Sequence, residues 1–229
     1  FIIGRPGSGY RVTIRWESAG ATHVGRIRRE NEDSFRIDDR NGIFIVADGM
    51  GGHAAGEIAS AVAAETVLNH LSEAIGSLSA SPRVSPAGGV VTAAESVGER
   101  IEQAILDAFA MAQRAMVVCC EDDPGTRGMG TTLTAAVLYP TGTIHIGHLG
   151  DSRVYRLQAG VLTQMTQDHT WVQQEVDAGR LSPEAARTHS LSHILTRVLS
   201  ADEPSGPDIL RAEVLPGDVY LLCSDGLHN

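Results

Sequence analysis

The sequence predicts an α+β fold in which groups of strands flank a central pair of long helices. Strand-like segments occur before residue 48 and after residue 130, and two stretches with apolar residues every three or four positions lie between them. Because the strands come in groups and do not alternate with single helices, we expect antiparallel sheets layered with helices. A length of 229 residues allows one large domain or two small ones, and we expect one core.

The first predicted strands precede the helices. Residues 12–16 alternate between apolar and polar side chains, which is typical of a half-buried strand. Residues 43–47 are all apolar, and the turn-forming sequence at 38–42 should fold them back onto residues 34–37. So short a connection predicts an antiparallel hairpin.

Two long helices are expected in the middle of the chain. Their apolar stripes run from about residue 57 to 78 and from about 97 to 118, the second through Ile101, Met111 and Val118. The Pro- and Gly-containing stretch at 79–89 separates them.

More strands should follow the helices. Residues 131–157 contain three apolar segments separated by short turns, which predicts a strand meander, and residues 209–223 predict a strand, a turn and a strand. The polar segment 169–200 is expected to be helix-like around Pro183.

The composition excludes several classes of function. The 28 acidic and 18 basic residues give a net charge of −10, which disfavours nucleic acid as a partner. All basic residues are Arg, so Schiff-base chemistry and a Walker-type phosphate loop, which need Lys, are excluded. No apolar run approaches the roughly 18 residues of a membrane span.

The cysteines indicate a reducing compartment. Cys119, Cys120 and Cys223 are odd in number and lack a Cys-x-x-Cys spacing, so neither a disulfide framework nor a zinc site is expected. We therefore expect a cytoplasmic protein. The chain begins at Phe1, so targeting signals are not readable.

Acidic residues recur at the ends of predicted strands, with glycine beside them in three of four segments. These segments are Asn31-Glu32-Asp33, Asp48-Gly49-Met50-Gly51-Gly52-His53, Gly150-Asp151-Ser152-Arg153 and Ser224-Asp225-Gly226. Carboxylates that converge repel one another unless their pKa values rise or cations lie between them. Oxygen ligands with few His or Cys nearby select Mg²⁺ or Mn²⁺ over zinc or copper.

Each of these residues also has a simpler interpretation. Asp48-Gly49 and Asp225-Gly226 are common turn pairs, and Asp151 followed by Ser152 could cap a turn. Arg28 lies in an arginine-rich stretch of the kind that usually forms a solvated face.

The motifs and their order resemble bacterial PPM phosphatases, the protein phosphatase 2C family of metal-dependent serine/threonine protein phosphatases. The resemblance rests on Gly25-x-x-Arg28-x-x-Asn31-Glu32-Asp33, Asp48 to His53 running into Gly56-Glu57, Gly128-Met129-Gly130-Thr131-Thr132, Gly150 to Arg153, and Ser224 to Leu227. It implies two antiparallel sheets between layers of helices, an α-β-β-α sandwich.

The resemblance also implies a metal centre. Asp48 matches the residue that bridges two core ions, the Gly49 carbonyl matches a ligand of one of them, and Asp225 matches another direct ligand. Asp33 matches an aspartate that reaches the cluster directly or through water. Asp151 matches the ligand of a third, weaker ion, and the ions are expected to be Mn²⁺ or Mg²⁺.

Arg28 matches the arginine that grips the substrate phosphate. His53 could donate a proton to the leaving group or simply be a surface histidine at a helix start. His193 lies in the segment that resembles the family's flap over the site, where contact with the third ion is a further hypothesis.

The implied reaction is hydrolysis of phosphoserine and phosphothreonine in proteins, the targets of serine/threonine kinases, by a hydroxide bridging two ions. Two alternatives remain open: a phosphatase-like regulatory domain that binds phosphoprotein with little turnover, and a general metal phosphoesterase.

The domain boundaries follow from the extent of the resemblance. Residues 1–19 are expected to be an N-terminal extension with the first strand, residues 20–229 the catalytic domain, and residues 169–200 a flap. Because the family's pattern continues beyond the Ser224–Gly226 motif, its C-terminal strands and one aspartate ligand are expected to be missing from the chain as given.

Overall fold

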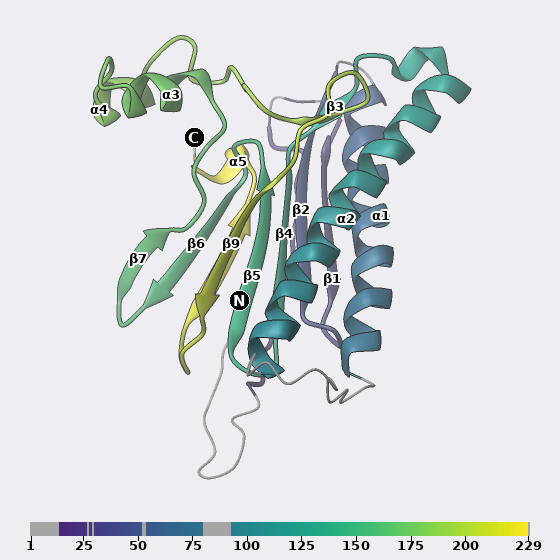
Figure 1. Cartoon of the computed structure of the whole chain (residues 1–229). Helices are drawn as coiled ribbons and strands as arrows, with labels where there is room; N and C mark the ends of the chain where they lie inside the picture. The colour runs from purple at the N-terminus through teal and green to yellow at the C-terminus, as the bar shows by residue number, and fades with distance from the viewer. Residues whose placement is uncertain (1–13, 27, 29, 52–53, 80–92, 229) are drawn as a thin grey trace.

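An antiparallel sheet of seven strands forms the centre of the computed structural model, which describes residues 14–26, 28, 30–51, 54–79 and 93–228 (Figure 1). Its order is β8-β3-β2-β4-β5-β9, and β1 pairs with β2. The strands are β1 Asp33–Asp38, β2 Ile43–Met50, β3 Gly130–Thr131, β4 Leu133–Tyr139, β5 Thr143–Leu149, β8 Leu199–Ser200 and β9 Asp208–Glu213.

The β1–β2 hairpin confirms the expected turn. Its two strands pair antiparallel from Asp33↔Asp48 to Asp38↔Ile43. At the turn, Asp38 accepts hydrogen bonds from the backbone and side-chain nitrogens of Asn41, at 3.1 and 2.7 Å. Gly42 has a φ of +69°, a conformation that L side chains rarely adopt.

Two helices, α1 Ala54–Ser79 and α2 Ala93–Asp122, cover one face of this sheet side by side (Figure 1). Their described buried apolar residues are Ala55, Ala59, Ala63, Ala64, Val67, Leu71, Ile75 and Leu78 in α1, and Ile101, Ala104, Ile105, Ala108, Phe109, Ala112 and Met116 in α2. Met111 and Val118, expected in the buried stripe, are exposed. A helix with 3.6 residues per turn drifts away from a strict three-and-four spacing, so the stripe passes through Phe109 and Met116 instead.

The stretch Val97–Asp122 of α2 is long and apolar enough to cross a membrane by length and composition alone. No such segment was expected from the sequence. In the structure the apolar side of this stretch contacts α1 and β5. The helix lies close to β5 at Gly147, where a Cβ would lie 2.3 Å from Ile105 of α2. The helix therefore packs as a core helix of this domain.

A second sheet of three strands, in the order β10-β6-β7, faces the other side of the large sheet. Its strands are β6 Arg153–Gln158, β7 Val161–Gln164 and β10 Val219–Cys223. A second apolar core lies between the sheets, where Val154 and Tyr220 pack with Phe44, Leu138 and Ile146. This core makes the domain a layered sandwich.

The predicted meander at 131–157 is only partly correct. β4 and β5 pair as expected, but the chain leaves the large sheet after β5, and β6 joins the small one. Likewise β9 and β10 form no hairpin, because β9 pairs with β5 and β10 pairs with β6. The strands were predictable from local pattern, whereas their partners depend on which core each apolar face joins.

Four short helical segments complete the described chain: η1 Pro124–Thr126, α3 Trp171–Asp177, α4 Pro183–Arg187 and α5 Asp225–His228. α3 and α4 fall in the segment expected to be helix-like, and Thr170 and Ser182 cap their N-termini. The α+β class with two antiparallel sheets is confirmed. Among the described residues, however, only α1 and α2 form a layer of long helices.

The expected first strand is not found in its described part. From Ile14 to residue 20 the chain is not a strand, although the backbone N–H of Ile14 donates to Pro140 O at 3.1 Å and its side chain joins the second core. Residues 12 and 13 lie outside the described residues.

Candidate metal centre

Asp33 and Asp48 stand opposite each other in the β1–β2 ladder. Three hydrogen bonds fix the backbone at Asp48. Thr131 Oγ1 donates to Asp48 O at 3.0 Å, the Thr132 N–H donates to the same oxygen at 2.9 Å, and the Asp48 N–H donates to Thr132 Oγ1 at 3.0 Å. The Gly-Met-Gly-Thr-Thr motif thus positions the central aspartate, a role that sequence reasoning missed.

Gly49 lies where three chain segments meet. Its N–H donates to Glu32 O at 3.0 Å, and a Cβ at this position would lie 1.9 Å from Gly56 O and 2.9 Å from Glu32 O. Only glycine fits this position, because any side chain would collide with backbone of the neighbouring segments. The close approach brings the end of β2 and the start of α1 next to Glu32, the residue before Asp33.

Asp225 reaches the same place from the small sheet. It follows β10 and begins α5, and the preceding Ser224 donates its hydroxyl to Asp33 Oδ2 at 2.8 Å. This bond joins residues 191 positions apart in the sequence. The structure therefore brings the predicted Asp33, Asp48 and Asp225 to one edge between the sheets.

The electrostatics of Asp48 reflect the carboxyl groups around it. The pKa of Asp48 is raised to about 8, first by burial and then by the negative charges of Asp33, Asp225 and Asp151 and a hydrogen bond with Asp225. In a protein without bound cations, the Asp48 carboxyl therefore holds a proton at neutral pH. A divalent cation would replace that proton and relieve the repulsion.

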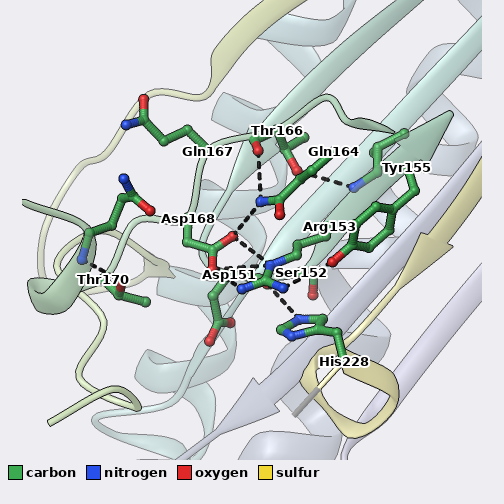
Figure 2. Close-up of polar contacts among 12 residues, drawn as sticks. Asp151, Ser152, Arg153, Tyr155, Gln164, Thr166, Gln167, Asp168, Thr170 and His228 are labelled. Carbon is green, nitrogen blue, oxygen red and sulfur yellow. Dashed lines mark hydrogen bonds and ion pairs between the residues drawn. The ribbon is translucent and has the colours of Figure 1, made fainter. Parts of the chain in front are cut away.

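Asp151 lies beside this cluster, in the break between β5 and β6. Burial raises its pKa to about 6, with Asp225 and Asp168 contributing next. Figure 2 shows the ion pair of Arg153 with Asp168 next to it, with Nη2 2.6 Å from Oδ2. The Asp151 carbonyl accepts from His228 Nε2 at 3.2 Å. Neither Asp168 nor His228 was singled out from the sequence.

The remaining predicted residues differ in their placement. Arg28 has a side chain that is 61% exposed, and its Nη1 lies 3.5 Å from Glu32 Oε2, a weak surface pair. His53 lies outside the described residues, and His193 is exposed in the segment after α4.

The chemistry of these residues fits a hard divalent ion. The groups are carboxylates and backbone carbonyls, the ligands that Mg²⁺ and Mn²⁺ prefer. In the described part of the chain, no three acidic, histidine or cysteine side chains already form a compact set of ligands. Carboxylates without a cation between them repel each other, so an open cluster agrees with the raised pKa of Asp48.

A family model described as protein phosphatase 2C matches residues 19–229. The chain belongs to the protein phosphatase 2C family. It is 38% identical over 220 residues to serine/threonine protein phosphatase PstP of Mycobacterium tuberculosis H37Rv, covering 96% of this chain but only 38% of that relative's length. It is 36% identical over 211 residues to serine/threonine phosphatase stp of Listeria monocytogenes EGD-e, covering 91% of this chain and 76% of that protein.

Solved structures of protein phosphatase 2C relatives share this fold. The crystal structure of M. tuberculosis PstP has a TM-score of 0.70 and 37% identity, over 89% of this chain and 75% of that one. A PstP catalytic domain in complex with two manganese ions has a TM-score of 0.66 and 36% identity, over 89% of this chain and 74% of that one. The predicted bacterial PPM assignment and the α+β fold are confirmed.

Proposed function

We propose that this protein phosphatase 2C domain hydrolyses phosphoserine and phosphothreonine in proteins with the help of divalent ions. The observation that carries the proposal is the half-buried carboxyl of Asp48, whose pKa is raised beside Asp33 and Asp225. Similar proteins named serine/threonine phosphatases support the same activity. The chain spans 38% of the length of the PstP relative, so the proposal concerns the activity of this domain.

The carboxylates have distinct proposed roles. Asp48 would be shared by two core ions, because it pairs with Asp33 in the ladder and interacts with Asp225 at the start of α5. The Gly49 carbonyl and Asp225 would provide further protein ligands, and Asp33 would reach the ions directly or through water. Asp151, at the side of the cluster, holds a third, weaker ion.

The residues of the chain prepare the reaction. Ser224 occupies one oxygen of Asp33 and so orients that carboxylate. Arg28 binds the substrate phosphate, for which its guanidinium is exposed and only weakly paired with Glu32. When bound, the two ions would supply the attacking hydroxide at their bridging position and neutralise phosphoryl charge, without a phosphoenzyme. Mn²⁺ and Mg²⁺ both suit these ligands.

Phosphorylated proteins, the products of serine/threonine kinases, are the proposed partners. The net charge of −10 disfavours polyanions such as nucleic acid. A cytoplasmic location is also part of the proposal, supported by three cysteines that carry no disulfide.

The alternative is a regulatory domain that binds phosphoprotein without turnover. Such a domain would be expected to lack metal-binding aspartates. Asp33, Asp48, Asp151 and Asp225 are all present. Burial and then the neighbouring carboxylates raise the pKa of Asp48 and of Asp151, which supports the enzyme.

The test is hydrolysis of a phosphothreonine peptide and of p-nitrophenyl phosphate with Mn²⁺, with Mg²⁺ and with EDTA. We expect ion-dependent release of phosphate and loss of turnover in Asp48→Asn, because one carboxylate serves both ions. Turnover that survives EDTA would contradict the metal mechanism. Peptide binding without turnover would favour the regulatory alternative, and hydrolysis of the aryl phosphate alone would favour a general phosphoesterase.

A further inference from the structure

Gly150, the residue before Asp151, is held at two points by His169. The Gly150 N–H donates to Nδ1 of the His169 ring at 3.0 Å, and the His169 N–H donates to Gly150 O at 2.8 Å. Gly150 has a φ of +110°, and a Cβ there would lie 2.6 Å from Thr132. Both backbone groups of this position, which only glycine can occupy, are therefore bonded to one histidine.

The backbone donor determines the tautomer of His169. Because an amide N–H can only donate, Nδ1 must accept, and a neutral ring then carries its proton on Nε2. That proton points to Asp208 Oδ2 at 3.0 Å. Arg197 Nη1 lies 2.9 Å from His169 Nε2. Because the guanidinium can only donate, its acceptor is Asp208 Oδ1 at 2.8 Å. Only 8% of the imidazole is exposed to solvent.

The other side of His169 belongs to the base of the segment that carries α3 and α4. We define this flap base as residues 169–171 and 194–197. Thr196 N–H donates to His169 O at 2.8 Å, and Trp171 N–H donates to Ile194 O at 2.8 Å. Asp208 begins β9, so Arg197 and His169 both anchor the flap base to the large sheet.

We propose that His169 is a positioning residue whose ring joins the Gly150–Asp151 loop to the flap base. Nδ1 fixes the backbone from which the Asp151 carboxylate projects, and Nε2 fixes the flap base through Asp208. The importance of this link for catalysis rests on the proposed function, since it concerns the side of the centre where the third ion would bind. The link itself is a property of the fold and is measurable without turnover.

Two substitutions separate the two ring nitrogens. His169→Asn places an amide oxygen near the position of Nδ1 and keeps an acceptor for Gly150, but loses the donor to Asp208. His169→Gln reaches the position of Nε2 with an amide donor for Asp208, but loses the acceptor for Gly150. His189→Asn is the matched control, because His189 Nδ1 accepts a backbone N–H within the flap, from Leu191 at 3.1 Å.

The first readout is amide hydrogen exchange of Gly150 in the protein without added ions. Loss of one buried hydrogen bond should speed exchange about tenfold in His169→Gln. His169→Asn and His189→Asn should stay within about twofold of wild type. Equal acceleration in the Asn and Gln variants would overturn the proposal. If His169→Gln does not fold, long-range ¹H–¹⁵N spectra of wild type decide: a ring proton on Nδ1 would overturn it.

The second readout is steady-state kinetics of the full-length protein. His169→Gln should raise the Mn²⁺ concentration for half-maximal activity by about tenfold, and His169→Asn should instead raise KM for a phosphopeptide by a similar factor. If His169 had a purely structural role, both variants would change the Mn²⁺ concentration for half-maximal activity and the KM alike. That result would refute separate roles for the two ring nitrogens. Absence of activity in wild type would refute the proposed function, while the exchange data would still decide whether His169 holds Gly150.

Discussion

Asp33 is the direct cross-strand partner of Asp48, so two acidic residues face each other in the β1–β2 ladder. Like charges opposite each other destabilise an antiparallel pair. The arrangement persists because Asp48 is protonated at neutral pH without cations and because Ser224 donates a hydrogen bond to Asp33. The domain therefore gives up some stability at the place where it gathers its proposed ligands.

The first prediction concerns stability and pH without cations. The pKa of Asp48 is about 8 in the folded chain against 3.8 for an ordinary aspartate, so the folded state binds this proton more tightly. The resulting stability is complete below about pH 4 and is lost as pH rises through about 8. In EDTA, the Tm of wild type should fall more steeply between pH 6 and 8 than that of Asp48→Asn, and Asp48→Asn should be more stable at pH 8 by on the order of 1 kcal/mol. Parallel melting curves for the two proteins would contradict the raised pKa.

The second prediction concerns Gly49. Gly49→Ala should destabilise the fold by roughly 2–4 kcal/mol, because its Cβ would collide with the carbonyls of Gly56 and Glu32. Gly206→Ala is the control, since no atom lies within 4 Å of a Cβ built there. Urea denaturation measures both, and a tolerated Gly49→Ala would show that the two segments can separate without cost.

The third prediction concerns phosphate recognition. Arg28→Ala should lower kcat/KM for a phosphopeptide about 10- to 100-fold and leave Mn²⁺ affinity unchanged, because a guanidinium contacts phosphate and not cations. Arg26→Ala, at a neighbouring exposed arginine, should have little effect. Weaker Mn²⁺ binding by Arg28→Ala, measured by calorimetry, would contradict the proposed role of Arg28 in binding phosphate.

The fourth prediction concerns Asp151. Asp151→Asn should abolish the weakest Mn²⁺ site and lower activity about tenfold or more, while the two core ions remain bound. The reason is position: Asp151 lies in the break between β5 and β6, beside the cluster around Asp48. Anomalous scattering from Mn²⁺ in crystals of this variant provides the measurement. Loss of both core ions would show that Asp151 belongs to the core centre.

The sequence by itself determined the local elements and the residue types of the site. The hairpin at Asp38–Gly42, the two long helices and the acidic strand ends follow from turn chemistry, apolar period and composition, which act over a few residues. The order of the motifs was also enough to predict the family that the comparisons confirm.

Only the tertiary structure decided which strands pair and which side chains hold the aspartates in place. β5 and β6 are consecutive yet join different sheets, because each has its apolar face in a different core. The bonds of Ser224 to Asp33 and of His169 to Gly150 join residues 191 and 19 positions apart, and no local pattern encodes them. Such contacts depend on how the two sheets pack, which is a property of the whole domain and not of any one segment.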